Sequence, residues 1–288
     1  MYSKKLIIYK NILKMKKYTL ILILSGFIKL FSSCQDVVDI PLNTANPRLV
    51  IEAAINWQKG TSGNVQRIKL TKTTNFYTNT IPTVSGAVII VSNSSNISFN
   101  FSEIGATGVY ECTNFVPIIN EQYKLNIILD GQNYAATETL KSVAVITNIT
   151  QEEQIAFGRK SLKIKALYID PPVEDNFYLY KFKFSNKPAP EYNTDEDKFF
   201  QGNPFFSLIF DDKIKTGDVI EITHFGISKS YFNYLSILLS VAGSTNGGPF
   251  QSPPATVKGN IRNNTDFSNY PLGYFSISEI DSKTYTIQ

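Results

Sequence analysis

The chain has 288 residues, of which 28 are basic and 24 acidic, and its formal net charge is +4. It contains one histidine and two cysteines, which excludes enzyme classes that depend on paired histidines and leaves too few ligands for a zinc site. Seven lysines precede Cys34, so residues 34–288 carry 21 basic and 24 acidic side chains. That part has no cluster of basic residues, and we expect no nucleic-acid partner.

Residues 1–33 have the pattern of a bacterial lipoprotein signal peptide. Lys16 and Lys17 form a charged start, a mostly apolar run follows over residues 18–31, and two serines stand directly before Cys34. In such signals the cysteine thiol receives a lipid and the peptide is cut just before it. We therefore predict that Cys34 is lipidated and anchors the protein to a bilayer.

Two features of this segment leave alternatives open. Met15, which is followed by two lysines, is a better translation start than Met1, so residues 1–14 are consistent with a start codon assigned too far upstream. Lys29 shortens the apolar run below the length of a spanning helix. The other interpretations of Cys34 are an ordinary cysteine after a cleavable signal, or part of an uncleaved membrane anchor.

Residues 34–47 are predicted to be a polar, lipidated tether. Gln35 follows the cysteine in place of the aspartate that commonly retains lipoproteins in the inner membrane, so we expect the outer membrane. Which face of that membrane the protein occupies stays open. Cys112 is then the remaining free thiol, and no intramolecular disulfide is expected.

The composition predicts a mainly β fold. Tyr and Phe total 36, and short apolar runs are separated by Asn, Ser, Thr and Gly. Residues 48–146 are predicted to form an immunoglobulin-like sandwich, with Asp130 and Gly131 as a hairpin turn. The expected strands are residues 49–55, 65–70, 87–91, 97–101, 108–112, 123–129 and 134–140.

Residues 147–288 are predicted to form a second antiparallel β domain that carries one amphipathic helix. The helix is expected near residues 227–242, where apolar residues recur at intervals of three and four, and we expect it to pack on the second sheet. A membrane or partner-binding helix is the alternative. The expected strands are residues 162–168, 178–184, 205–210, 219–225, 273–278 and 284–287.

Two long polar stretches, residues 185–204 and 243–260, are predicted to be loops without internal elements. Long loops in compact domains are usually functional or disordered. They carry candidate binding aromatics that would stack on a sugar or cover a partner surface. The alternative is that these side chains cover the edges of the sandwich. The candidates are Tyr192, Phe199, Phe200 and Phe250.

Three acidic clusters are predicted to be solvated turn residues. Alternatively, two facing carboxylates would suit a glycoside hydrolase, and oxygen ligands would suit calcium. None of the clusters has the spacing of a calcium-binding loop, so we predict no metal site and no cofactor. The clusters are Asp195 to Asp197, Asp211 with Asp212, and Asp170 with Glu174 and Asp175.

The one histidine, His224, falls in an alternating run. It shares a predicted strand face with Ile220 and Ile222, so we expect a partly buried strand residue in place of a catalytic base. The sequence has no G-x-S-x-G turn for a serine nucleophile.

Several segments resemble the bacterial lipoprotein family known as domain of unknown function 4249. They are DVVDIPLNTANPRLVIEAAINW after the cysteine, VSGAVIIV, GVYECTNF, YKLNIILDGQNYAATETL, PFQSPPATVKGNIRNN and PLGYFSIS. The most specific block runs from Pro249 to Asn263 and continues from Leu272 to Phe275. Phe31 and Lys29 depart from a tidy lipid-attachment motif.

This resemblance implies an outer-membrane lipoprotein that is often encoded beside a TonB-dependent receptor. It also implies a transthyretin-like or immunoglobulin-like first sandwich, and it supplies no activity. We therefore expect a noncatalytic accessory that binds such a receptor or captures a ligand for it. The alternatives are a carboxylate-based hydrolase of surface glycans and an adhesin or structural surface protein.

Overall fold

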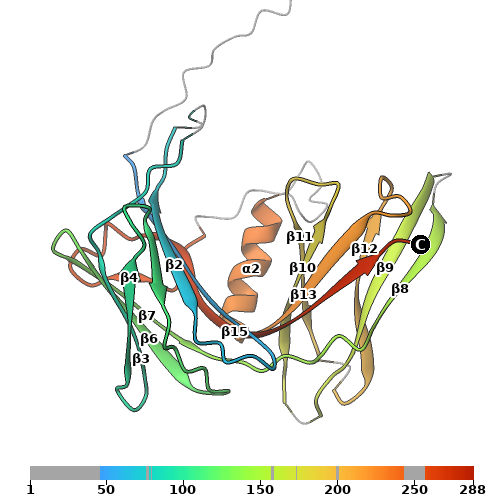
Figure 1. Ribbon diagram of the computed structural model, residues 1–288, viewed down its shortest axis with the longest axis horizontal. Coiled ribbons are helices and arrows are strands. Elements are labelled where there is room, and N and C mark those ends of the chain that lie inside the picture. Colours follow the sequence, from blue (N-terminus) through green and yellow to red (C-terminus); the bar gives the residue numbers. More distant parts are fainter. Residues whose placement is uncertain are drawn as a thin grey trace, which may run out of the picture. The chain divides into compact units, whose positions relative to one another are not determined.

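The computed structural model describes residues 46–75, 78, 80–156, 159–172, 174–198, 201–242 and 257–288 (Figure 1). Residues 46–288 form one compact unit. The predicted signal peptide, Cys34 and the tether up to residue 45 lie outside the described residues. In the part of the chain that is described, no helix has the length and apolar character needed to cross a membrane.

The fold is mainly β, as predicted, and its first part is a sandwich (Figure 1). One layer has the strand order β15-β1-β2-β5 and the other β3-β6-β7-β14, while β4 pairs with both β5 and β3. Apolar side chains from both layers fill one core. The strands are β1 (Leu49–Gln58), β2 (Gln66–Lys72), β3 (Val88–Asn93), β4 (Ser98–Glu103), β5 (Val109–Cys112), β6 (Gln122–Leu129), β7 (Gln132–Thr139), β14 (Arg262–Asn263) and β15 (Leu272–Thr286).

Alternation of apolar and polar residues explains these strands. In β6, Tyr123, Leu125 and Ile127 are fully buried, while the residues between them face outward. The hairpin turn is confirmed, because Asp130 and Gly131 have φ angles of 49° and 72°. Two successive positive φ angles match the twist of the flanking strands.

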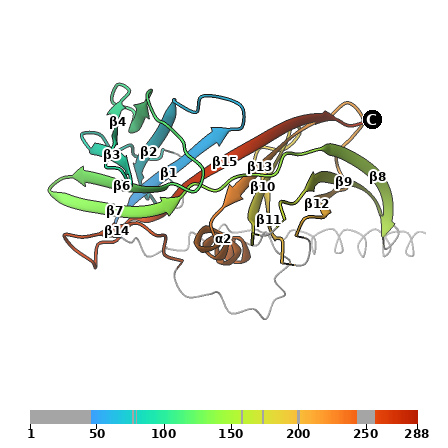
Figure 2. The same ribbon diagram turned by 90° about the horizontal axis from the view of Figure 1, so that it is seen from below.

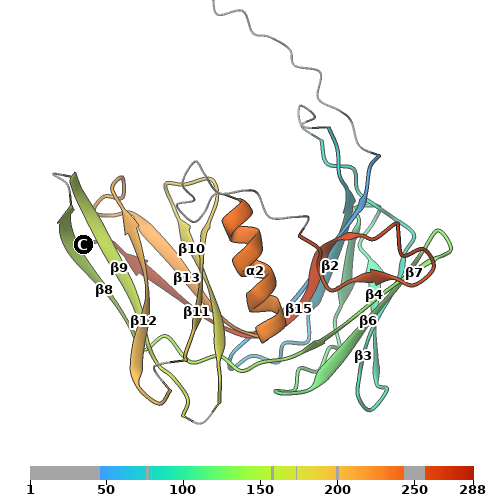
Figure 3. The ribbon, with the colours of Figure 1, turned by 180° about the vertical axis from the view of Figure 1, so that it is seen from behind.

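The second part of the fold is another sandwich (Figure 3). One layer has the order β11-β10-β13-β15 and the other β12-β9-β8, and side chains from both layers share a second core. The added strands are β8 (Asn148–Ala156), β9 (Arg159–Ile169), β10 (Phe177–Phe184), β11 (Glu191–Glu196), β12 (Pro204–Asp211) and β13 (Val219–Ile227).

The prediction of a loop without internal elements over residues 185–204 was wrong. Strand β11 lies inside it and pairs with β10 along its whole length. The strand was missed because its sequence is polar and shows no apolar alternation. In the structure, Asn193 of β11 donates a hydrogen bond to the carbonyl of Leu208 on β12, 2.7 Å away, and this contact closes one side of the sandwich. The second predicted loop, residues 243–260, lies largely outside the described residues.

The predicted helix is confirmed as α2 (Lys229–Val241). Ser228 caps it, because its hydroxyl accepts a hydrogen bond from the backbone N–H of Tyr231 at 3.1 Å. The helix packs on the outer face of the sheet, where Leu235 contacts a small core with Leu179 and Ile227.

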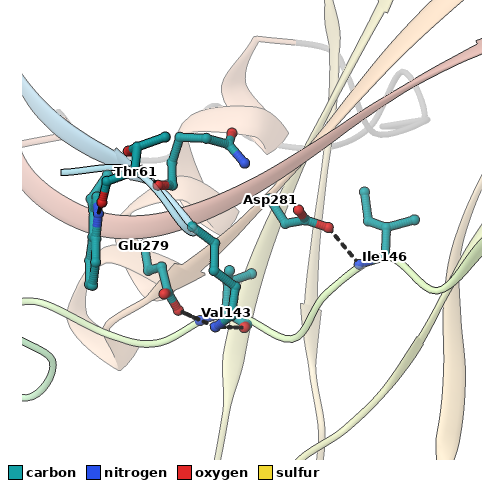
Figure 4. A network of polar contacts seen from close by, with 8 residues as sticks. Thr61, Val143, Ile146, Glu279 and Asp281 are labelled. Atoms are coloured by element: carbon teal, nitrogen blue, oxygen red, sulfur yellow. Dashed lines mark hydrogen bonds and ion pairs between the residues drawn. The ribbon is translucent and has the colours of Figure 1, made fainter. Parts of the chain in front are cut away.

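Strand β15 was predicted as two short strands and is one strand of 15 residues. It starts parallel to β1, then leaves the first sandwich and pairs with β13 in the second (Figure 2). Its polar middle suggested a break. The structure gives those side chains partners: Glu279 and Asp281 accept hydrogen bonds from the backbone N–H groups of Val143 and Ile146, at 2.9 and 2.7 Å (Figure 4).

These contacts hold residues 141–146, which lead from one sandwich to the other. The backbone of this segment also packs on Gly226 of β13, where a Cβ atom would meet the carbonyl oxygen of Ser142 at 1.9 Å. The division predicted between residues 48–146 and 147–288 stays a prediction, with one refinement. Ile261, Phe275 and Ile277 come from the later part of the chain but pack in the first core.

Candidate functional site

The second sandwich concentrates buried polar atoms that have no hydrogen-bond partner. Buried polar groups in folded proteins are nearly always paired, so each exception calls for an explanation. Among the described residues, six such side-chain atoms occur, and all of them lie in or at one end of this sandwich. They are Asp170 Oδ2, Asn176 Oδ1, Tyr180 Oη, Asp195 Oδ2, His224 Nδ1 and His224 Nε2.

The deeper part of this region, the inner cluster, consists of Tyr168, Tyr180, Asp195 and His224. Alternation places each side chain between the layers: Tyr168 on β9, Tyr180 on β10, Asp195 on β11 and His224 on β13. The His224 ring stacks on Tyr180, with centroids 4.1 Å apart and planes inclined by 14°. Tyr168 and Tyr178 lie 5.0 and 4.6 Å from the same ring.

The enclosure of His224 determines its charge. Its side chain is fully buried, and burial lowers its pKa from 6.5 to about 3, against a smaller opposing effect from the backbone of Ala144. The imidazole is therefore neutral at physiological pH, with one nitrogen as a donor and the other as an acceptor.

Burial also shifts the pKa values of Asp195 and Tyr180 towards their neutral forms. Burial raises the pKa of the Asp195 carboxyl, and a hydrogen bond with Ser207 offsets this only in part. Burial raises the pKa of Tyr180 well above its ordinary value, and the nearby charges of Asp195 and Asp170 raise it further.

Three further side chains, the strand-end oxygens, lie at one end of the sandwich. Asp170 follows β9, Asn176 precedes β10 and Asp197 follows β11. The backbone N–H of Asn176 donates to Asp197 Oδ2 at 2.8 Å, and the N–H of Asp197 donates to the carbonyl of Asn176 at 3.2 Å. The Tyr178 hydroxyl donates to Asp170 Oδ1 at 2.8 Å, which connects these oxygens to the inner cluster.

Asp170 and Asp197 are 1% and 2% exposed. Burial raises the pKa of Asp170, the hydrogen bond from Tyr178 lowers it, and the charge of Asp197 raises it again; the backbone N–H of Gly202 lowers it, and a hydrogen bond with the Asp197 side chain raises it. Neither carboxylate takes part in an ion pair of the described residues. Two carboxylates therefore share a buried place without a cationic side chain, which is costly.

Asp211, on the inward face of β12, shows how a buried carboxylate is usually stabilised. It is 6% exposed and forms an ion pair with Lys187. Its carboxylate also accepts the backbone N–H groups of Lys213 and Ile214 at 2.7 and 2.6 Å. Burial alone would raise its pKa, but Lys187 and the two N–H groups hold it below the usual value.

The prediction that the acidic clusters are solvated was therefore wrong for one or two members of each. Asp170, Asp197 and Asp211 are buried and Asp195 is half-buried, whereas their neighbours Glu174, Asp175, Glu196 and Asp212 are exposed. The period of two explains the difference, because it continues past the strand ends. Extending the inward face of β9 by one step to Asp170 would have found the first of them.

The prediction for His224 holds for its face and fails for its degree of burial. It shares the inward face of β13 with Ile220 and Ile222, and all three are 0% exposed. The three tyrosines around it come from two other strands, so periodicity within β13 could not reveal the enclosure.

Of the candidate binding aromatics, only Tyr192 is described. It lies on β11, is 37% exposed and faces outward, away from the inner cluster. Phe199, Phe200 and Phe250 lie outside the described residues.

The family model for the domain of unknown function DUF4249 matches residues 35–284. The chain belongs to this family. A structural likeness was found to a two-domain fibronectin type III segment of chicken tenascin, with 10% identity, a TM-score of 0.21, and coverage of 63% of this chain and 91% of that one. No curated protein matches the chain. Membership in DUF4249 confirms the resemblance noted in the sequence and assigns no activity.

Proposed function

We propose that this DUF4249 protein is a noncatalytic lipoprotein of the outer membrane. Cys34 carries its lipid, and the second sandwich captures a small polar ligand for a partner receptor of the TonB-dependent class. The observation that carries this proposal is the inner cluster, where Tyr180, Asp195 and His224 leave hydrogen-bonding atoms unused. Unused donors and acceptors inside a protein suit a ligand or ordered water that completes them.

The placement of the carboxylates favours binding over the hydrolase alternative. A glycoside hydrolase needs two carboxyl groups that a polymeric substrate reaches. Asp170 and Asp197, which lie together, are 1% and 2% exposed and face the interior. Carboxylates enclosed in this way do not suit a polymeric glycan, whereas a small ligand could be held by the inner cluster.

Lipid attachment is tested with the two cysteines as a matched pair. Cells that express the full chain are labelled with an alkyne palmitate analogue. We expect Cys34→Ala to lose the label and leave the membrane fraction. Cys112→Ala serves as the control, because Cys112 is buried in the first core and should not affect lipidation. Label that persists in Cys34→Ala would contradict the anchor.

Receptor partnership is tested by affinity purification of the native lipoprotein from outer membranes in several gentle detergents. We expect a TonB-dependent receptor to co-purify with the wild-type chain and with Cys112→Ala. Recovery of the lipoprotein without such a receptor in every detergent would overturn the accessory role.

A further inference from the structure

We propose that the strand-end oxygens Asp170, Asn176 and Asp197 bind a calcium ion. They supply two carboxylates and one amide oxygen from three neighbouring strand ends. Hard cations such as Ca²⁺ take six to eight oxygen ligands in a flexible geometry, which backbone carbonyls and water complete. The donor set contains no nitrogen or sulfur, which disfavours zinc and other soft metals.

The first argument is that two of these oxygens are left without partners. Tyr178 satisfies Asp170 Oδ1, but Asp170 Oδ2 and Asn176 Oδ1 are buried and accept no hydrogen bond. When Asp170 is ionised, both atoms are acceptors, and a cation or a donor completes them.

The second argument is charge. Asp170 and Asp197 lie together, nearly fully buried, and the comparison with Asp211 shows what the fold does elsewhere with a buried carboxylate. Asp211 has Lys187 beside it. A divalent cation would neutralise the two charges of the pair at once, as Lys187 does for Asp211.

A cavity lies beside Asn176, one of the three proposed ligands. Asn176 lines this cavity of about 160 Å³ together with the exposed acids Glu174 and Asp175, and with Lys141 and Lys229. The described residues contain no group of three His, Cys, Asp or Glu side chains placed for a metal, so the amide of Asn176 is essential to this site. Water and backbone carbonyls would supply the remaining ligands.

The test uses the full chain in detergent and CaCl₂ alone as the ligand. We expect saturable heat of binding in calorimetry and a rise in Tm of roughly 5 to 10 °C, relative to EGTA, at a hundredfold excess over Kd. The isosteric variant D170N/D197N should lose both responses. D195N is the matched control, because Asp195 is a half-buried carboxylate of the same sandwich that is not among the proposed ligands, and it should keep both responses.

A second measurement covers the case in which the double variant fails to fold. Tb³⁺ replaces Ca²⁺ and emits when a nearby tyrosine is excited, and Tyr178 is hydrogen-bonded to Asp170. We expect sensitised emission from the wild-type chain that Ca²⁺ displaces, and loss of most of it in Tyr178→Phe with calcium binding retained. No heat, no shift in Tm and no emission would overturn the site, as would full responses in D170N/D197N.

The calcium site is independent of the proposed capture function. The receptor experiment above contains no calcium step, and calcium binding is measured on the isolated chain. Failure of one therefore leaves the other standing.

Discussion

The two sandwiches differ in how their cores treat polar groups. In the first core, the buried tyrosines Tyr110 and Tyr123 each have a partner: their hydroxyls donate to the carbonyls of Val84 and Val116, at 3.1 and 2.7 Å. In the second core, the Tyr180 hydroxyl has none. The hydroxyls of Tyr110 and Tyr123 in the first core are therefore satisfied within the protein, whereas the Tyr180 hydroxyl in the second core is free to bond a ligand or water.

The same difference appears for charged groups. The second core encloses an imidazole and lies beside the carboxylates of Asp170 and Asp195, whereas Glu138, a carboxylate buried in the first sandwich, accepts hydrogen bonds from the backbone N–H of Thr139 at 2.9 Å and from the Tyr274 hydroxyl at 3.2 Å. Such groups oppose folding unless something pairs with them. The first sandwich is therefore the natural source of stability, and the second is the natural place for binding. The single tryptophan, Trp57, packs against the first core and so reports on that sandwich.

The largest expected effect is acid lability of the second sandwich through His224. Its folded pKa is about 3, against 6.5 ordinarily, so the unfolded chain takes up a proton below pH 6.5 that the folded chain does not. The contribution to stability is complete above pH 6.5 and falls towards pH 3, by about 1.4 kcal/mol per pH unit and roughly 5 kcal/mol in all. His224→Phe should remove this part of the pH dependence.

Urea unfolding at pH 7 and pH 4.5, followed by near-UV circular dichroism of the tyrosines, measures the effect. Asp170 and Asp195 act in the opposite sense, because their raised pKa values mean that their burial opposes folding less as the pH falls. The comparison with His224→Phe isolates the histidine. Equal pH dependence in the two proteins would show that His224 is not enclosed as described.

The next effect concerns the connection between the sandwiches. Glu279 is 4% exposed, pairs with Lys59 at 2.8 Å and accepts the N–H of Val143. Glu279→Ala leaves that buried N–H unpaired, and we expect a loss of about 2 to 4 kcal/mol in the free energy of unfolding.

The matched control is Glu52→Ala. Glu52 is exposed and lies 4.0 Å from Lys69, so its loss should cost at most about 0.5 kcal/mol. If Glu279 joins the two sandwiches, Trp57 fluorescence and far-UV circular dichroism should give separate transitions in Glu279→Ala only. Coincident transitions with unchanged midpoints would contradict this role.

Much of the first sandwich was predictable, because strands β1 to β7 mostly alternate between buried and more exposed residues and the Asp130–Gly131 turn depends on local residues. The second was less so. Strand β11 is polar and depends on pairing with β10, and β15 has a polar middle whose partners lie more than a hundred residues earlier in the chain. The candidate site was missed for the same reason. Its members come from separate strands, and no local pattern shows that Tyr168 and His224 meet.

The smallest expected effect compares one hydroxyl in each core. Tyr123→Phe removes a group that donates to the carbonyl of Val116 and accepts the N–H of Ile118, at 2.7 and 3.0 Å. We expect a loss of about 1 to 2 kcal/mol in the free energy of unfolding, since two backbone groups lose their partner. Tyr180→Phe removes a hydroxyl without a partner, and we expect no loss or a slight gain.

Urea unfolding of both variants as ligand-free full chains measures the pair, with the wild-type chain as reference. The sign of the change in unfolding free energy for Tyr180→Phe decides the comparison, because the two substitutions delete the same atom from equally buried rings. An equal loss for both would mean that ordered water already completes the second core, which would leave no hydroxyl there for a captured ligand. A loss confined to Tyr123→Phe means that the Tyr180 hydroxyl costs stability in the free protein, and a bound ligand is what would repay that cost.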